Sequence, residues 1–208
     1  MIIVEKKEIT NLTKASIQGI KTTIKSRLKG RTTPLVVSID GGSGAGKSTI
    51  ATETAMQLGA TVIQCDDFFA ATVTSEEWDA SSPEEKCLRC IDWKRMRTEV
   101  LSPLIAGETV QYHPFSFSSR NGLSDSIVTK VPSRVILLDG IYSSLPILSD
   151  VVDLKVLVDV SPDIRRHRHN LREGSKDEEW HLLWDPAEDY YFSVLCPPAS
   201  FDLIVSNR

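Results

Sequence analysis

An apolar segment runs directly into a glycine-rich turn in the stretch Leu35-Val36-Val37-Ser38-Ile39-Asp40-Gly41-Gly42-Ser43-Gly44-Ala45-Gly46-Lys47-Ser48. Residues 35–40 have the composition of a short strand that is buried on both faces of a parallel sheet. Residues 41–48 fit the pattern G-x-x-x-x-G-K-[ST], and the helical composition of residues 47–58 ends at Gly59. A strand, this turn and a helix in that order predict a loop that binds nucleotide phosphates.

Each part of the pattern has a physical role. The glycines let backbone N–H groups curl around phosphate oxygens, and the helix N-terminus adds partial positive charge. We expect Lys47 to reach the β- and γ-phosphates and Ser48 to bind Mg²⁺. The alternative is a glycine-rich turn with an incidental lysine. The predicted nucleotide-binding residues of the turn are Gly41, Gly42, Ser43, Gly44, Ala45, Gly46, Lys47, Ser48 and Thr49.

Further apolar segments flank this unit along the chain. Strand-like runs occupy residues 134–139 and 154–159, shorter candidates occupy 61–64 and 202–205, and helical stretches lie between them. Strands that alternate with helices imply a parallel sheet covered on both faces. The sequence therefore predicts an α/β fold, a three-layer P-loop NTPase sandwich with a roughly five-stranded parallel sheet and a small lid.

The length of 208 residues suits one hydrophobic core, so we expect a single domain over 1–208. Apolar positions from Ile9 to Leu28 recur at helical spacing and predict a leading helix within residues 1–33. We expect a core over 35–205 and a lid at about 162–176. The polar segments 70–85 and 114–132 show little periodicity and are expected to be excursions at the edge of the sheet.

Composition limits the classes of partner. Twenty-four Lys and Arg against 28 Asp and Glu leave a net charge of −4, which is not the charge balance of a protein that wraps nucleic acid. The first residues become charged after four positions, and no long apolar run follows. We expect a cytoplasmic protein that binds a small-molecule acceptor and neither nucleic acid nor a membrane, and we leave a homo-oligomer open.

Four cysteines are present, of which only Cys87 and Cys90 have a spacing seen in metal sites. No second pair and no paired histidines accompany them, so we expect ordinary thiols on a helix rather than zinc ligands.

Carboxylates follow two of the predicted strands. Asp139 ends the strand 134–139 and is in the position of an acid that holds Mg²⁺ or its water. Asp66 and Asp67 follow the strand 61–64, so they are expected at the same sheet edge, where one could take a proton from an acceptor hydroxyl. A turn-forming or capping role is the alternative for each of these acids.

Arginines follow the helix start at Ser161-Pro162. Spacings of three and four residues place Arg165, Arg168 and Arg172 on one helix face. Such a stripe predicts a lid that closes on phosphates, and the alternative is a solvated basic face. Weaker patterns give two further expectations. We expect His167 and His169 to lie at the surface. We expect core packing for Trp93, Trp180 and Trp184.

These motifs together resemble the uridine kinase and phosphoribulokinase family of P-loop kinases, which is related to the nicotinamide riboside kinases. The resemblance extends from about residue 35 to residue 205. It implies ATP as substrate and Mg²⁺ as cofactor. The chain departs from the family in having Asp139 where the family usually has Glu, His113-Pro114 where uridine kinases usually have an acid, and one lid arginine fewer.

The resemblance also assigns roles to residues. The catalytic residues that it implies are Lys47, Asp66 and Arg168. Arg165 and Arg172 are implied in nucleotide binding. The implied substrate-binding residues are Asp66, Phe68, Asp92, Tyr112 and His113. The implied metal positions are Ser48, Asp66 and Asp139.

The resulting hypothesis is a kinase that transfers the γ-phosphoryl group of Mg·ATP to a hydroxyl of a small molecule, a nucleoside or another polyol metabolite. Alternatives are a nicotinamide riboside, pantothenate or sugar kinase, an NTP-hydrolysing switch or metallochaperone, and a nonenzymatic nucleotide-binding protein. The guanine-reading pattern Asn-Lys-x-Asp of switch proteins is absent from the sequence. The acceptor, the choice of ATP or GTP, and whether Asp66 or Asp67 is the base stay open.

Overall fold

The computed structural model describes residues 10–119, 121–174 and 177–207. Ile9 of the expected leading helix, the charged start of the chain and lid residues 175–176 lie outside these residues. The main helices are α1 Asn11–Arg27, α2 Lys47–Leu58, α3 Ser75–Ala80, α4 Pro83–Arg89, α5 Trp93–Met96, α6 Ser102–Ile105, α7 Pro162–Glu173 and α8 Glu178–Tyr190. The strands are β1 Leu35–Asp40, β2 Thr61–Gln64, β3 Val110–Tyr112, β4 Val128–Lys130, β5 Val135–Asp139, β6 Leu154–Asp159 and β7 Leu203–Ser206.

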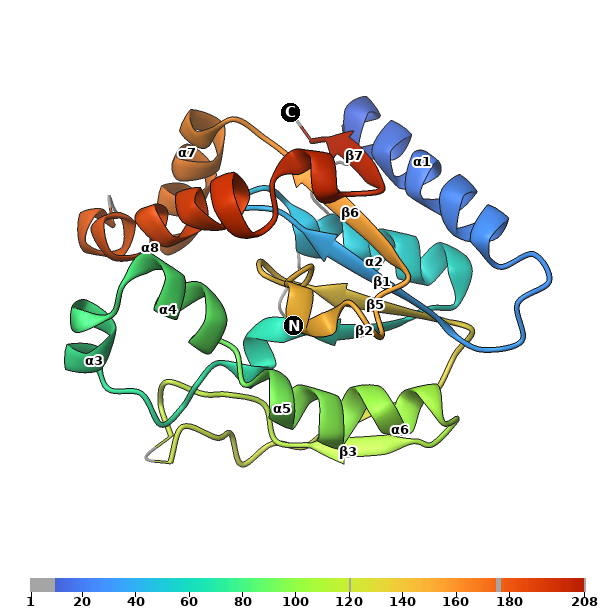
Figure 1. Cartoon of the computed structure of the whole chain (residues 1–208), viewed down its shortest axis with the longest axis horizontal. Coiled ribbons are helices and arrows are strands. Elements are labelled where there is room, and N and C mark those ends of the chain that lie inside the picture. Colours follow the sequence, from blue (N-terminus) through green and yellow to red (C-terminus); the bar gives the residue numbers. More distant parts are fainter. Residues whose placement is uncertain (1–9, 120, 175–176, 208) are drawn as a thin grey trace, which may run out of the picture.

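Five strands form one parallel sheet in the order β2-β5-β1-β6-β7. Helices cover both faces of this sheet (Figure 1), which confirms the predicted α/β class. The predicted strands at residues 35–40, 61–64 and 154–159 have the predicted bounds, as has the helix at 47–58. The strand predicted at 134–139 begins one residue later, and the strand predicted at 202–205 is shifted by one residue.

Alternate side chains of the sheet enter two hydrophobic cores. On one face, Val37, Ile39 and Leu137 pack with apolar residues of α1 and α2. On the other face, Ile63, Ile136 and other sheet residues pack with α4, α5, α6 and α8. All six residues of β1 are buried, as a central parallel strand requires. Burial on both faces explains why these strands are continuous apolar runs in the sequence.

The two polar segments contain regular structure that periodicity did not predict. The segment 70–85 contains α3 and the start of α4, each of which begins with a capping box, from Thr74 to Glu77 and from Ser82 to Glu85. The segment 114–132 contains β4, which pairs antiparallel with β3 outside the main sheet. Helices of six and seven residues and strands of three are too short for a periodic pattern to be visible.

The sheet register brings three segments together at one edge. Asp139, the last residue of β5, lies between Ile39 of β1 and Gln64 of β2. The residues after these three positions therefore leave the sheet side by side. Figure 1 shows α7, α8, α3 and α4 grouped at this end of the sheet.

Across the described residues, no helix combines the length and the apolar character that crossing a bilayer requires.

Gly140 allows the segments that follow β5 and β2 to approach closely. A Cβ atom at this position would lie 2.5 Å from the Cβ atom of the fully buried Cys65. We expect Gly140→Ala to lower the free energy of unfolding by about 1–3 kcal/mol, because the added methyl group would overlap the buried side chain of Cys65. Urea denaturation measures the effect.

Gly19 in α1 provides the matched control, since a Cβ atom there would meet nothing within 4 Å. Gly19→Ala should stabilise the protein by about 0.5–1 kcal/mol through helix propensity. Equal stability of the wild type and Gly140→Ala would show that the close approach at the sheet edge is not a constraint.

Candidate active site

The turn between β1 and α2 has the geometry of a phosphate-binding loop. Gly44 and Gly46 have left-handed φ values of 76° and 87°, which side chains disfavour. Space is limited as well, because a Cβ atom at Gly44 would lie 2.3 Å from the carbonyl oxygen of Arg165, and one at Gly46 would lie 2.2 Å from Nδ2 of Asn207. Conformation and packing therefore both require glycine at these positions.

The loop presents donors that suit an anion. Gly46 is the N-cap of α2 and provides no side-chain cap, so the first N–H groups of the helix have no capping side chain. The Nζ atom of Lys47 donates to the carbonyl of Gly42 at 3.0 Å and lines the adjoining cavity. These groups fit the phosphates of a nucleotide.

The buried carboxylate of Asp40 fixes the start of the loop. It accepts hydrogen bonds from the backbone N–H of Gly41 (2.7 Å), of Tyr142 (3.2 Å) and of Ser144 (2.9 Å) and from the hydroxyl of Tyr191 (2.6 Å). Burial raises the pKa of this carboxyl group, and the bond from Tyr191 is the largest opposing effect. The carboxylate thus joins the loop to the segment after β5 and to Tyr191, the residue that directly follows α8.

Asp139 and Ser48 fit a magnesium ion. Asp139 is 4% exposed, and its buried Oδ1 atom has no hydrogen-bond partner among the described residues. Burial raises the pKa of Asp139, and the positive charge of Lys47 is the largest effect that opposes this rise. A buried carboxylate oxygen without a partner, beside a serine hydroxyl, is an oxygen-donor set of the kind that Mg²⁺ prefers.

Asp66 and Asp67 have different surroundings. Both lie in the short 3-10 helix Cys65–Phe68 that follows β2. Asp66 is exposed and lines the cavity, whereas Asp67 accepts a hydrogen bond of 2.6 Å from the hydroxyl of Tyr112. Asp66 is therefore the carboxylate that is available to a ligand.

One cavity of about 680 Å³ joins these groups. Its phosphate end contains Ser43, Gly44, Lys47 and Ser48, and Asp139 and Asp66 lie along it. Beyond Asp66 the cavity continues between side chains of α3, α8 and the segment 115–117. A volume of this size accommodates small-molecule ligands.

The three arginines of the predicted lid do not all face the phosphate-binding loop. Arg165 donates to the carbonyl of Ser43 at 3.4 Å and pairs with Glu188 of α8, and Arg172 lines the cavity. Arg168 instead donates to the backbone carbonyl of Asn207 at 2.9 Å and does not line the cavity. At about 100° per residue, position 168 lies about 60° around the helix from position 165, whereas position 172 lies about 20° from it.

Two residues near the loop were not predicted. Glu188 is 3% exposed and accepts a hydrogen bond of 2.9 Å from the backbone N–H of Ser43. His169 was expected at the surface, but it is 2% exposed, stacks on Trp180 at 4.1 Å and lies 3.3 Å from the hydroxyl of Ser43. The expectation for His169 is wrong because α8 covers it, whereas His167 is exposed as expected.

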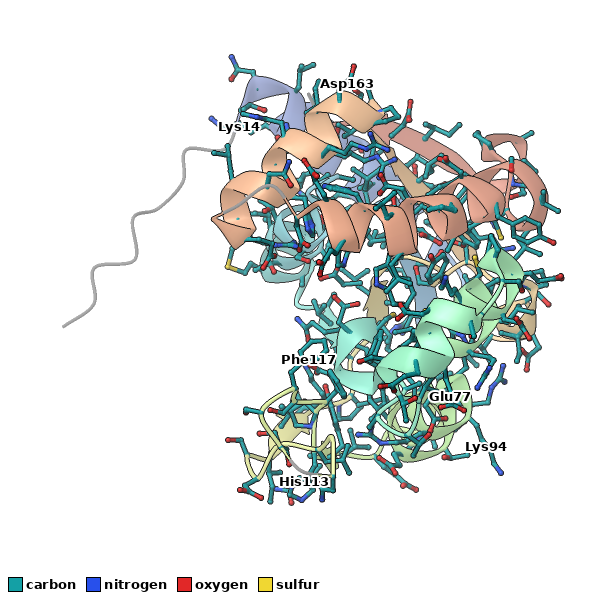
Figure 2. All side chains as sticks on the ribbon, turned by 90° about the vertical axis from the view of Figure 1, so that its left-hand side faces the viewer. Lys14, Glu77, Lys94, His113, Phe117 and Asp163 are labelled. Carbon is teal, nitrogen blue, oxygen red and sulfur yellow. The ribbon has the colours of Figure 1, made fainter. Side chains whose placement is uncertain are left out.

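Four of the predicted substrate-binding residues lie outside the cavity. Phe68 is fully buried against the ring of Tyr112, and the Tyr112 hydroxyl is bonded to Asp67. Asp92 caps α5 by accepting from the N–H of Arg95. His113 is exposed, lies 2.8 Å from the Ser124 carbonyl through Nδ1, and lies at the far end of its segment from α7 and α8 (Figure 2).

Phe69, next to Phe68, lines the cavity instead. Trp93 packs in the core as predicted. Trp184 is half-buried and packs against the core as predicted, although it also lines the cavity. Trp180 is half-buried, lines the cavity and stacks on His169, so the expectation of core packing is wrong for Trp180. No sequence signal distinguishes which of two adjacent phenylalanines faces a ligand.

Comparison with known proteins identifies sequences that are related to this chain. Residues 36–176 match the model of the Phosphoribulokinase / Uridine kinase family. The uridine kinase of Brevibacillus brevis is 29% identical over 177 residues, which are 79% of this chain and 76% of that protein. The uridine kinase of Halobacterium salinarum is 27% identical over 132 residues, 62% of this chain and 58% of that protein.

A solved structure is similar over nearly the whole chain. It is described as a possible uridine kinase from Bacillus stearothermophilus and superposes with a TM-score of 0.69, covering 92% of this chain and 98% of that one at 19% identity. This likeness supports the fold predicted from the sequence.

The different positions of Arg168 and Arg172 allow a test of the predicted lid. Arg172 lines the cavity, and its Nη2 atom lies 3.2 Å from Nδ1 of His169, which itself lies 3.3 Å from the hydroxyl of Ser43 in the loop. We therefore expect Arg172→Ala to lower kcat about tenfold or more, which is about 1.4 kcal/mol or more in barrier height. Arg168→Ala is the matched control, since Arg168 binds Asn207 outside the cavity. Steady-state ATP turnover measures both. A large loss in Arg168→Ala with no loss in Arg172→Ala would support the role that the sequence assigned to Arg168.

Proposed function

This chain belongs to the phosphoribulokinase / uridine kinase family of P-loop kinases, and we propose that it transfers the γ-phosphoryl group of ATP to a hydroxyl group of a small organic alcohol. The observation that carries the proposal is the convergence of Lys47, Asp139 and Asp66 on one cavity. The first two residues suit a magnesium nucleotide, and the third is a free carboxylate where an acceptor would lie.

In the proposed reaction the acceptor oxygen attacks the γ-phosphorus atom. A bond forms between these two atoms, and the bond from the γ-phosphorus to the β,γ-bridging oxygen breaks, which leaves ADP. Asp66 takes the proton of the acceptor hydroxyl. This role needs a carboxylate without a competing partner, and Asp66 rather than Asp67 meets that requirement.

The loop residues hold the nucleotide in place. Backbone N–H groups at the start of α2 bind phosphate oxygens, and the ammonium group of Lys47 moves from the Gly42 carbonyl to the phosphates. Ser48 and Asp139 would hold Mg²⁺, which when bound neutralises charge on the β- and γ-phosphates. Arg172 would add positive charge from the lid side.

A hydrolytic switch is the competing function, since water would then be the nucleophile. The extension of the cavity beyond Asp66 favours an organic acceptor, because a water molecule needs no such space. The names of the relatives make a nucleoside the first acceptor to test. The matched region covers 58% of the Halobacterium enzyme, so its activity is carried over here only as a proposal.

Release of ADP with and without acceptors tests the proposal. We expect slow turnover with Mg·ATP alone and a clear increase when one member of a panel of uridine, cytidine, nicotinamide riboside, pantothenate and fructose is added. A rate that is the same with every acceptor and with none would contradict a kinase and favour a hydrolytic switch.

Substitution of the proposed base gives a sharper prediction. We expect Asp66→Asn to lower phosphoryl transfer about 10²–10⁴-fold while ATP still binds, because the amide keeps the shape but cannot take the proton. Asp67→Asn is the matched control, and its amide oxygen can still accept from Tyr112, so the rate should change little. If Asp67→Asn is the damaging change and Asp66→Asn the mild one, Asp67 is the base.

A further inference from the structure

We propose that Asn207 is a positioning residue of the phosphate-binding loop and that the leading helix α1 holds its side chain in place through Thr13. The amide of Asn207 fixes the peptide between Ala45 and Gly46 so that the N–H group of this peptide faces a bound phosphate. The inference rests on nucleotide binding by the loop and not on the nature of the acceptor. It extends the site to two residues outside 36–176, the part of the chain that matches the family model.

The side chain of Asn207 contacts the loop directly. Its Nδ2 atom donates to the carbonyl oxygen of Ala45 at 2.8 Å, and both residues are buried. A Cβ atom at Gly46 would lie 2.2 Å from the same Nδ2 atom, so the amide packs against the loop with no room for a side chain between them. Because β1, β6 and β7 are parallel, the residue after β7 and the loop after β1 lie at the same edge of the sheet.

This hydrogen bond sets the direction of one peptide. The peptide between Ala45 and Gly46 is trans, and in a planar trans peptide the carbonyl and N–H groups point in opposite directions. Asn207 lies outside the cavity that Gly44, Lys47 and Ser48 line. With the carbonyl of Ala45 turned toward Asn207, the N–H of Gly46 is turned the other way. No backbone carbonyl in the described part of the chain accepts from this N–H, so it is available to an anion.

The helix α2 does not fix the carbonyl of Ala45. The backbone hydrogen bond at the start of α2 runs from the N–H of Ile50 to the carbonyl of Gly46 at 3.2 Å, one residue further along the chain. Without the amide of Asn207, the buried carbonyl of Ala45 would lose its partner, which costs free energy. A rotation of the peptide toward the cavity would relieve that cost, but it would replace an N–H donor with a carbonyl oxygen that repels phosphate.

Thr13 of α1 fixes the amide of Asn207 in turn. Its Oγ1 atom donates to Oδ1 of Asn207 at 2.6 Å, and this bond is buried. Oγ1 of Thr10, the N-cap of α1, lies 2.8 Å from Oγ1 of Thr13. A hydroxyl group has one hydrogen, and Thr13 gives it to Asn207, so Thr10 is the donor of the two threonines. The donors therefore follow one direction, from Thr10 through Thr13 and Asn207 to the carbonyl of Ala45.

Two neighbouring contacts are separate from this series of hydrogen bonds. Arg168 donates to the backbone carbonyl of Asn207 at 2.9 Å and not to its amide. Ser16, about one turn after Thr13 in α1, is buried and donates to the backbone carbonyl of Ser206 at 2.6 Å. Ser16 thus joins α1 to the end of β7, which lies beside it in Figure 1, without contact to the loop. Substitution of Thr13 or of Ser16 can therefore separate the placement of the amide from the attachment of α1.

Binding of Mg·ADP to the full chain tests the proposal, with calorimetry to measure the Kd and urea denaturation to measure the stability of each variant. We expect Thr13→Val to weaken Mg·ADP binding about fivefold, because valine keeps the shape of threonine but cannot donate to Asn207. Thr13→Ser keeps the hydroxyl group and should bind within about twofold of the wild type. Asn207→Ala removes the donor to Ala45 and should weaken binding about tenfold.

Ser16→Ala is the matched control, because it also removes one buried hydrogen bond between α1 and the end of β7. Its stability should fall about as far as that of Thr13→Val, while its Kd for Mg·ADP should stay within about twofold of the wild type. An equal loss of affinity in Thr13→Val and Ser16→Ala would overturn the proposal, since the attachment of α1 alone would then account for it. An unchanged Kd in Thr13→Val or in Asn207→Ala would overturn it too, and if one of these two variants does not fold, the other decides.

The same variants separate this inference from the proposed function, because Mg·ADP binding needs no acceptor. Weakened Mg·ADP binding in Thr13→Val and Asn207→Ala, without phosphoryl transfer to any alcohol by the wild type, would contradict the kinase and leave the role of Asn207 in place. Transfer to an alcohol by Asn207→Ala with the wild-type Kd for Mg·ADP would contradict the role of Asn207 and leave the kinase in place.

Discussion

The candidate site depends on one buried carboxylate, that of Asp40. It accepts four hydrogen bonds, from Gly41, Tyr142, Ser144 and Tyr191, so that the phosphate-binding loop, the segment after β5 and the region after α8 share one anchor. Tyr142 has a φ of 69°, which costs free energy in a residue with a large side chain. The hydrogen bond to Asp40 and the edge-to-face packing of Tyr142 on Tyr191 at 4.9 Å hold it there. Asp139, three residues earlier, is held by the pairing of β5 with β1 and β2, so the two restraints act on one short segment.

The parts of the molecule that the sequence predicts well are those in which one local pattern determines the structure. β1, the glycine-rich turn and α2 form a continuous unit, and burial on both faces makes the strand visible as an apolar run. The capping boxes that begin α3 and α4 were also present in the sequence, but the helices are too short for periodicity to support them. The role of Asp40 was not predicted. An aspartate at the end of a strand looks like a turn former until Tyr142, Ser144 and Tyr191, its partners 102, 104 and 151 residues away in the chain, are known.

The site residues divide in the same way. The phosphate end uses backbone N–H groups and residues next to them in the chain, so the motif alone identifies it. The acceptor end uses side chains whose direction depends on tertiary packing, which explains why Phe68 was predicted and Phe69 lines the cavity. His169 was misplaced for the same reason, since only the position of α8 shows that it is covered. Arg168 and Arg172 share a helix face in the sequence, but only Arg172 lines the cavity in the fold.

The central claim is that the three segments meeting at the sheet edge perform phosphoryl transfer to an alcohol. The fate of the γ-phosphoryl group tests it most directly, and ³¹P NMR follows that fate in a mixture of the protein, Mg·ATP and an acceptor. The account predicts a phosphate-monoester resonance that is coupled to the protons of the acceptor's carbinol carbon and that needs both Mg²⁺ and Lys47. Inorganic phosphate as the only new product, at a rate independent of any acceptor, would contradict it.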